Sequence, residues 1–198
     1  ATIIGTLQAG FSKFEYLGEA SERIIAREAL LGVSMTGIME AYDICLDPTI
    51  QRRGATIVKK TNKKMAEILG INQAARTTCI KPEGTSSCIL GTSSGIHPHH
   101  AKRYIRRVQA NKMEPIYNYF RGENPRACEE SVWSNNESDD VVAFCVEVKD
   151  GSKTKNKVDA IQLLEYVKST QQSWVLNGTN PDLCTQPWLN HNISNTIN

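Results

Sequence analysis

The residues of this chain that could do chemistry concentrate between Lys81 and Ser87, in the run Lys-Pro-Glu-Gly-Thr-Ser-Ser. Gly84 permits a tight turn, and three consecutive hydroxyl side chains follow it where a short helix is expected to begin. An apolar-leaning run at 74–80 precedes the turn. A strand that passes through a turn into a helix N-terminus presents free backbone N–H groups and the positive end of the helix dipole. Such an arrangement binds anions, and it predicts phosphate as the ligand.

The loop departs from the standard phosphate-binding patterns. The chain contains neither G-x-x-x-x-G-K-[ST] nor G-x-G-x-x-G after a strand. The spacing therefore supports neither a P-loop nor a dinucleotide-binding fold. On spacing alone, a Ser/Thr-rich turn that only caps a helix is the more frequent use of such a pattern. Local chemistry leaves both alternatives open.

Histidines and arginines downstream form two further candidate groups. The run His-Pro-His-His at 97–100 could ligate a metal. A proline interrupts that run and no carboxylate or thiolate stands near it in the sequence, so a loop with surface imidazoles is the preferred interpretation. Arg103, Arg106 and Arg107 could neutralise a polyphosphate or line a solvated strand edge, and both roles stay open. Glu83 is expected to stabilise the turn rather than to act as a base.

The cysteine spacing gives no support to a metal or redox motif. No C-x-x-C pair occurs, which argues against a zinc knuckle and against a thioredoxin-like site. Most of the thiols are expected to be free and buried. The six cysteines are Cys45, Cys79, Cys88, Cys128, Cys145 and Cys184.

Composition predicts one folded domain or a piece of one. The chain has 198 residues, of which 40% are hydrophobic and 22% charged. These proportions are those of a globular protein rather than a disordered one. The formal net charge of +2 gives no reason to expect a nucleic acid or an anionic membrane as partner. No apolar run approaches the ~20 residues of a membrane span and no signal-peptide layout begins the chain, so a cytoplasmic protein is expected.

Helical and strand patterns alternate along the chain. Amphipathic or short helices are expected at 20–31, 40–46, 51–69, 114–120 and 158–175. Strands are expected at 32–39, 77–80, 104–109, 141–148 and 191–197, and a loop or insertion at 123–140. Glu28 is expected to face water, and Pro48 to break the chain. The alternation predicts an α/β fold with parallel strand pairing.

Six blocks of sequence carry a resemblance to a known family. They are GTLQ at 5–8, LGVSMTGIM at 31–39, KPEGTSS at 81–87, SGIHP at 94–98 with YIRRV at 104–108, GTNP at 178–181 and HNISNTI at 191–197. Together, in this order and across nearly the whole chain, they resemble the class II, adenosylcobalamin-dependent ribonucleotide reductases. The chain looks like a fragment from the second half of that family's catalytic barrel.

The resemblance implies a fold, an activity and a site. The fold is part of a ten-stranded α/β barrel, with residues 1–198 forming one segment of the catalytic barrel domain. The activity is the reduction of ribonucleotides to 2′-deoxyribonucleotides by a radical mechanism, as in deoxyribonucleotide synthesis for DNA replication, with adenosylcobalamin bound by the full-length enzyme. The implied substrate-phosphate residues are Pro82, Glu83, Gly84, Thr85, Ser86 and Ser87, with Arg103, Arg106 and Arg107 as candidate further contacts.

The family's radical cysteine lies in an Asn-Pro-Cys-Gly-Glu motif that this sequence does not match. The runs at 124–128 and 180–184 begin with Asn-Pro but continue differently. In that family the radical cysteine lies on a finger loop inside the barrel, and reducing cysteines lie near the C-terminus. The finger loop is expected upstream of Ala1 and the reducing cysteines beyond Asn198. No catalytic residue is therefore assigned, and the fragment is expected to be inactive alone. The implied partners are a ribonucleoside di- or triphosphate, the upstream half of the enzyme and an external dithiol such as thioredoxin. The alternatives are a non-catalytic nucleotide- or phosphate-binding module, or a structural partner that completes a split barrel.

Overall fold

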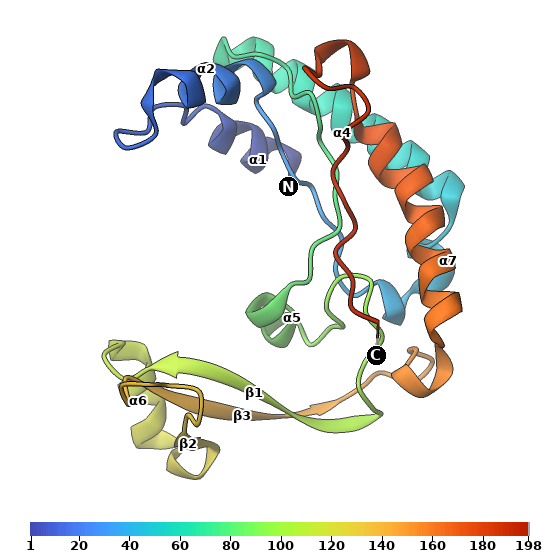
Figure 1. Ribbon diagram of the computed structural model, residues 1–198. Helices are drawn as coiled ribbons and strands as arrows, with labels where there is room; N and C mark the ends of the chain where they lie inside the picture. The colour runs from blue at the N-terminus through green and yellow to red at the C-terminus, as the bar shows by residue number, and fades with distance from the viewer. Residues whose placement is uncertain (198) are drawn as a thin grey trace.

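Three extended segments lie side by side through the middle of the molecule (Figure 1). The structure is a computed structural model that describes residues 1–197, and of Thr85 it describes the backbone only. Val33 pairs with Thr78, and Ile80 pairs with Ile193, both in parallel. The parallel pairing expected from the sequence is therefore confirmed for these segments, with 76–80 in the centre.

Two helical rods cover one side of the extended segments (Figure 1). The first is α4 (Pro48–Leu69), and the second is α7 (Ala160–Thr170), which continues through a π-helical turn, η4 (Gln171–Val175). The Trp174 indole N–H donates to the carbonyl of Cys79 at 3.0 Å, which ties the second rod to the central segment. These two rods bury the apolar side of the extended segments.

Pro48 is the first residue of α4. Asp47 caps the helix, because its Oδ1 accepts hydrogen bonds from the backbone N–H groups of Thr49 and Ile50 at 2.7 and 3.0 Å. Proline is favourable at the first helical position, where its missing N–H would have no intrahelical partner. The expected break between two helices is therefore present, at Leu46 and Asp47, but the second helix begins at Pro48 rather than at the expected Gln51. Gly70 ends the helix at φ 66°, as its place after the last apolar residue predicts.

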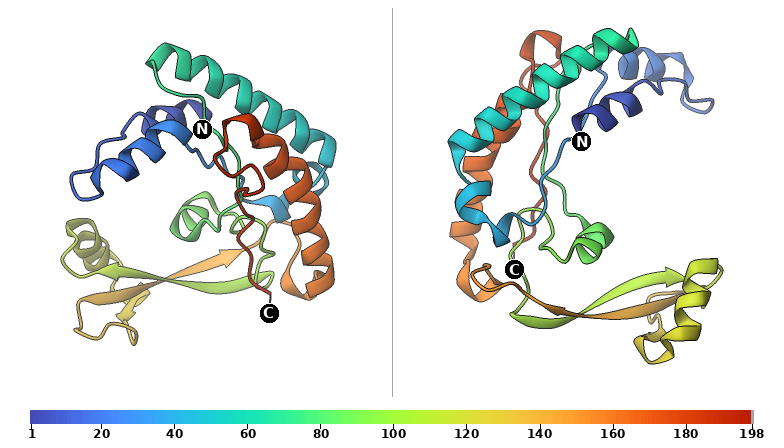
Figure 2. Two further views of the ribbon diagram at one scale, coloured as in Figure 1. Left: turned by 45° about the horizontal axis from the view of Figure 1, so that its top comes forward. Right: turned by 180° about the vertical axis from the view of Figure 1, so that it is seen from behind.

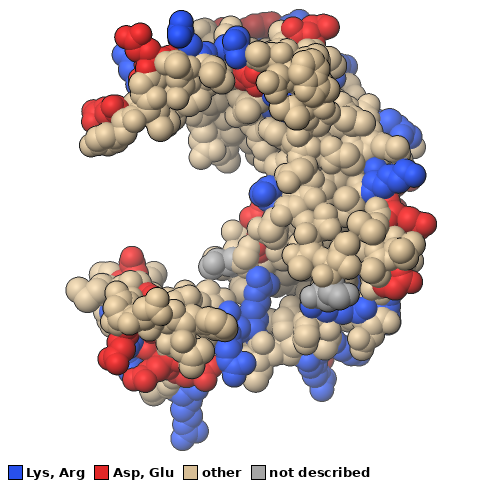
Figure 3. All heavy atoms as spheres, in the orientation of Figure 1, with Lys and Arg blue, Asp and Glu red and all other residues tan. Residues whose placement is uncertain are grey.

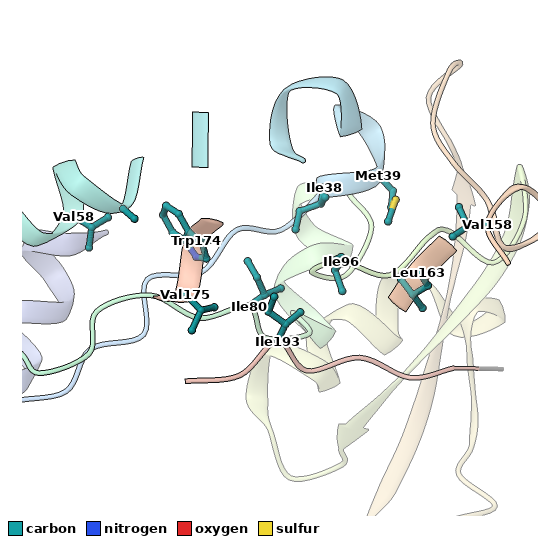
Figure 4. Close-up of a cluster of buried hydrophobic side chains, with 11 residues drawn as sticks. Ile38, Met39, Val58, Ile80, Ile96, Val158, Leu163, Trp174, Val175 and Ile193 are labelled. Atoms are coloured by element: carbon teal, nitrogen blue, oxygen red, sulfur yellow. The ribbon is translucent and has the colours of Figure 1, made fainter. Parts of the chain in front are cut away.

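The hydrophobic core fills the space between the helical rods and the extended segments (Figure 4). Its aromatic member, Trp174, contributes the largest apolar surface. Gly54 makes room for this ring, because a Cβ at that position would lie 3.0 Å from Trp174 Cζ3. The buried cluster consists of Ile38, Met39, Ala55, Val58, Ile80, Ile96, Val158, Leu163, Trp174, Val175 and Ile193.

Two helices, α1 (Thr2–Ala9) and α2 (Gly18–Glu28), form the N-terminal part of the molecule. The expectation that Glu28 faces water was wrong. Its carboxylate is buried and lies 2.7 Å from Arg76 Nη1 on the central segment. Thr185 also donates to Glu28, so this carboxylate joins α2, the central segment and the C-terminal part of the chain.

An antiparallel hairpin forms the opposite end of the molecule and projects from the body (Figure 2). It pairs β1 (Arg103–Asn111) with β3 (Asp139–Glu147), and β2 (Cys128–Glu130) adds to the other edge of β3. The strand expected at 141–148 exists, but its pairing is antiparallel rather than parallel. β1 and β3 are joined by a long connection at one end of the sheet, so no crossover helix is needed. Antiparallel pairing then satisfies the backbone N–H and C=O groups of both strands.

Short elements complete the chain. α6 (Pro115–Glu123) and η2 (Pro125–Ala127) lie between β1 and β2. α6 ends where the expected insertion at 123–140 begins, and η2 lies within that insertion. The others are η1 (Ile38–Glu40), α3 (Tyr42–Cys45), α5 (Gly84–Leu90), η3 (Lys155–Lys157), η5 (Leu176–Gly178) and η6 (Pro181–Leu183). No helix among residues 1–197 combines the length and apolar content of a membrane span.

The cysteines differ from expectation. Cys79 is buried, Cys145 is exposed and the other four are partly exposed, so the prediction that most thiols are buried was wrong. The overall α/β class is confirmed by the mixed helices and strands. The described residues form an open arrangement, and the ten-stranded barrel remains an expectation for a larger assembly.

Candidate functional site

The chemistry-rich loop leads from the central extended segment into α5. An extended segment, a turn and a helix follow one another in the order the sequence predicts, although residues 77–80 form isolated bridges rather than a full strand. Glu83 takes the N-cap position. The first helical bond runs from Ser87 N–H to Glu83 C=O at 3.3 Å. Among the described atoms, which exclude the Thr85 side chain, no acceptor is found for the backbone N–H groups of Gly84 and Ser86. The start of α5 therefore offers unpaired donors, as the anion-site prediction requires.

The side chains of this loop divide into an accessible group and a buried one. Pro82, Gly84 and Ser86 are exposed and Glu83 is half-buried, whereas the side chain of Thr85 lies outside the described residues. Ser87 is fully buried, and its hydroxyl donates to Gly84 C=O at 3.0 Å. The hydroxyl of Ser87 thus shapes the loop from inside, and that of Ser86 faces out.

Arg106 of β1 reaches across to the same loop. Its Nη1 donates to the hydroxyl of Ser87 at 3.1 Å, and its Nη2 donates to Gly84 C=O at 2.6 Å. Two nitrogens of one guanidinium therefore donate to the first turn of α5. The hairpin and the candidate anion site are physically joined at this residue.

The structure separates the three candidate arginines. Arg103 pairs with Glu147 at 2.8 Å and Arg107 pairs with Glu129 at 2.6 Å, both at exposed positions. Successive side chains of a strand point to opposite faces, so Arg103 and Arg107 share the face opposite to Arg106. The structure therefore brings one of the three candidates to the loop.

A buried histidine lies at the base of the hairpin, in contact with Tyr104 of β1. The His99 side chain is 1% exposed, with Nε2 against Glu40 Oε1 and Nδ1 at 3.1 Å from the Tyr104 hydroxyl. The expectation of surface imidazoles was wrong for His99, although His100 is exposed. Glu40 is 59 positions away in the sequence, so the run at 97–100 gave no signal of this partner. The described residues contain no group of three or more His, Cys, Asp or Glu side chains placed to hold a metal.

Glu40 is held on several sides. Its Oε1 accepts from Ser93 N–H at 2.5 Å and its Oε2 from the Ser93 hydroxyl at 2.9 Å. Burial raises the pKa of Glu40, but the hydrogen bonds from His99 and Ser93 outweigh burial and leave this pKa below its ordinary value. Burial raises the pKa of Tyr104. A neutral imidazole satisfies both contacts by donating from Nε2 to Glu40 and accepting at Nδ1 from Tyr104.

Two glycines allow these segments to approach. Gly37 has φ 72°, and a Cβ there would lie 3.1 Å from Thr92 Cβ. Gly95 has φ 56°, and a Cβ there would lie 2.8 Å from the carbonyl oxygen of Lys81. Only glycine adopts such a conformation at low cost in so little space. The blocks at 31–39, 81–87 and 94–98 therefore converge on one place.

A cavity of about 660 Å³ borders the loop. Glu83 lines one end of it, and α1, α2 and the segment 29–34 supply apolar walls, including Phe11 and Leu31. Its size lies within the ~300–1,000 Å³ typical of small-molecule sites. Figure 3 shows the molecule hollowed on one side, where Lys and Arg side chains reach the inner wall.

Comparison with known proteins gives consistent matches to one kind of enzyme. No family model matches the chain. It is 27% identical, over 56% of its length, to the adenosylcobalamin-dependent ribonucleoside-triphosphate reductase of Lactobacillus helveticus (strain DPC 4571) and covers 18% of that protein. It is 28% identical, over 46% of its length, to a probable adenosylcobalamin-dependent ribonucleoside-triphosphate reductase of Dictyostelium discoideum and covers 12% of it.

A solved structure supports the same similarity at the level of fold. The chain aligns with a crystal structure of a B12-dependent (class II) ribonucleotide reductase at a TM-score of 0.63 and 18% identity, covering 87% of this chain and 29% of that one. The resemblance carried by the six blocks is thus confirmed. The chain spans less than a fifth of the curated relatives described above.

Proposed function

We propose that this chain is a segment of an adenosylcobalamin-dependent ribonucleotide reductase and supplies the loop that holds the substrate's phosphates. The observation that carries the proposal is the loop at 82–87, which opens α5 with unpaired N–H donors in a fold similar to a class II ribonucleotide reductase. The reaction is the replacement of a ribose 2′-hydroxyl by hydrogen. A ribonucleoside triphosphate is the favoured substrate, because the two relatives described above are triphosphate reductases.

The loop acts through donors that are fixed before the ligand arrives. Phosphate oxygens accept from the N–H groups of Gly84 and Ser86 and from the exposed hydroxyl of Ser86. The positive end of the α5 dipole adds a favourable field, and Arg106 adds a full positive charge. Ser87 holds the first turn in place from inside. The loop residues Pro82, Glu83 and Thr85 complete the proposed site.

The cofactor belongs to the full-length protein. Adenosylcobalamin supplies the radical chemistry when it is bound. A corrinoid is larger than the ligands that cavities of about 660 Å³ accept, so we assign none of residues 1–197 to holding it. The chain's own part is to bind and orient the phosphate end of the substrate.

The remaining polypeptide of the enzyme is the principal partner in this proposal. Residues 1–198 form one segment of a catalytic barrel domain, and the part that carries the radical cysteine pairs with it. An external dithiol such as thioredoxin restores the reduced enzyme after each turnover, and the enzyme works in the cytoplasm. These partners follow from the family resemblance.

Reconstitution tests the proposal. Ribonucleoside triphosphate reduction is measured with the chain alone and after mixing it with a polypeptide that contains the family's Asn-Pro-Cys-Gly-Glu segment. We expect no turnover by the chain alone and turnover in the mixture that requires adenosylcobalamin. A mixture that binds triphosphate and forms a stable complex, yet never turns over, would instead support a non-catalytic binding module.

A further inference from the structure

Hydrogen bonds connect Glu40 of η1 through the buried His99 to Tyr104 of β1, and Arg106 of the same strand contacts the α5 loop. We propose that Glu40, His99 and Tyr104 are positioning residues that hold the Arg106 guanidinium against the first turn of α5. The inference rests on the proposed phosphate-binding function of that loop. Among the described residues, Arg106 is the one hairpin residue whose side chain forms a hydrogen bond with α5. The proposed positioning explains why the hairpin contacts the site there.

The side chain of Glu40 is held in place by hydrogen bonds. Ser93 binds both of its carboxylate oxygens, and the side chain is 14% exposed. The adjacent residue, Met39, is fully buried in the core, and its carbonyl accepts from Lys153 N–H at 3.0 Å. A charge that is held on both oxygens beside a packed core residue has little freedom to move.

His99 connects Glu40 to Tyr104 at the base of the hairpin. Its backbone N–H donates to Lys153 C=O at 3.1 Å, and its C=O accepts from Lys155 N–H at 2.8 Å, so the main chain is fixed on both sides. The imidazole then spans from Glu40 to the hydroxyl of Tyr104. Tyr104 is the second residue of β1, so its anchoring sets the angle at which the strand leaves the body.

Arg106 is the residue that the other three position. It stands two residues after Tyr104 and therefore projects from the same face of β1. Among the salt bridges of residues 1–197, Arg103 and Arg107 each have a carboxylate partner, whereas none includes Arg106. Its contacts in the loop are neutral oxygens. A guanidinium held by neutral acceptors keeps its charge available to a phosphate.

Nuclear magnetic resonance of the 198-residue chain tests the positioning directly. The signal of the Arg106 side-chain Nε–H is followed in Tyr104→Phe, which removes one hydroxyl, and in His99→Gln. We expect both substitutions to shift this signal and to increase its mobility. Arg107→Ala is the matched control, because Arg107 lies on the same strand but faces away, and it should leave the Arg106 signal in place. Thermal melting confirms that each variant is folded.

Binding of inorganic tripolyphosphate gives the functional readout. Arg106→Ala should weaken binding about tenfold, the loss expected for one charged hydrogen bond. Tyr104→Phe should weaken it several-fold in the natural background and cause no further loss in the Arg106→Ala background. An unchanged Arg106 signal in Tyr104→Phe, or a binding loss that adds fully to that of Arg106→Ala, would overturn the inference. If the unaltered chain binds no tripolyphosphate, the proposed function of the loop fails, while the Arg106 signal still decides the positioning.

Discussion

At the scale of residues, polar pairs formed between distant parts of the sequence define the site. The loop at 82–87 could be identified from its own composition, because a turn glycine followed by hydroxyls is a local signal. His99 could not be assigned correctly, since its partner Glu40 lies 59 positions away. Glu28 and Arg76 are 48 positions apart, and nothing near either residue indicates that they pair. Burial of a charged side chain is decided by tertiary contacts that no local pattern contains.

The two serines that end the loop motif should respond differently to substitution. Ser86→Ala removes an exposed donor to a charged phosphate, a bond worth about 1.5–3 kcal/mol, so triphosphate affinity should fall on the order of ten- to a hundredfold. Ser87→Ala removes the buried hydroxyl that donates to Gly84 C=O and accepts from Arg106, so it should lower the stability by about 1 kcal/mol and weaken triphosphate binding less than Ser86→Ala does. Calorimetric titration and thermal melting of both variants separate the two effects. Full affinity in Ser86→Ala would exclude that hydroxyl from the site.

At the scale of elements, the sequence predicted helices and strands better than their pairing. The end of α4 at Gly70 and the extended segment that enters α5 follow from local chemistry. The antiparallel pairing of β3 with β1 does not, because an apolar β-branched run fits either direction. The start of α4 at Pro48 rather than at Gln51 was missed, because proline both separates segments and begins helices, and here it does both after the Asp47 cap.

The hairpin carries its own acid-sensitive contact. Asp140 is buried, and hydrogen bonding from Tyr117, together with the charges of Lys112 and Arg121, lowers its pKa despite the opposing effect of burial. A depressed pKa in the folded state contributes stability above the unfolded value of about 3.9, and this contribution is lost as pH falls through the folded value. Docking of α6 on β3 should therefore be stable at neutral pH and weaken below about pH 4.

Resonances of the Tyr117 ring report this docking locally, which matters because Glu28 and Glu40 also have lowered pKa values. Their loss of ionisation would destabilise the body of the molecule rather than α6. Asp140→Asn keeps the shape of the side chain and removes its charge, so it should flatten the pH response of Tyr117. An equal response in Asp140→Asn and in the unaltered chain would show that another group controls the docking.

At the scale of the whole molecule, the chain exposes more surface than its mass requires. Its accessible surface is 12685 Å². A compact monomer of 22.0 kDa would expose about 9,300 Å². The excess of roughly a third matches the hollowed shape in Figure 3 and the projecting hairpin in Figure 2. Such an excess of surface is large enough to form an interface with another polypeptide.

Small-angle X-ray scattering should detect this openness. A compact chain of 198 residues has a radius of gyration of about 16 Å, and the open arrangement should exceed that value. Addition of the complementary polypeptide should give a complex whose scattering is that of a compact particle. A monomer at about 16 Å on its own would mean that the chain closes on itself. That result would favour an autonomous module over a barrel segment.

Nuclear magnetic resonance can show whether the start of α5 binds the phosphates of a nucleotide. A ribonucleoside triphosphate is titrated into the isotopically labelled chain. We expect the amide resonances of Gly84 and Ser86 to shift with a common saturation curve, and the Arg106 side-chain signal to shift with them. Gly84→Val should abolish the shifts, because its side chain fills the space in front of the free N–H groups. Saturable shifts confined to other parts of the chain, or none at all, would contradict the claim.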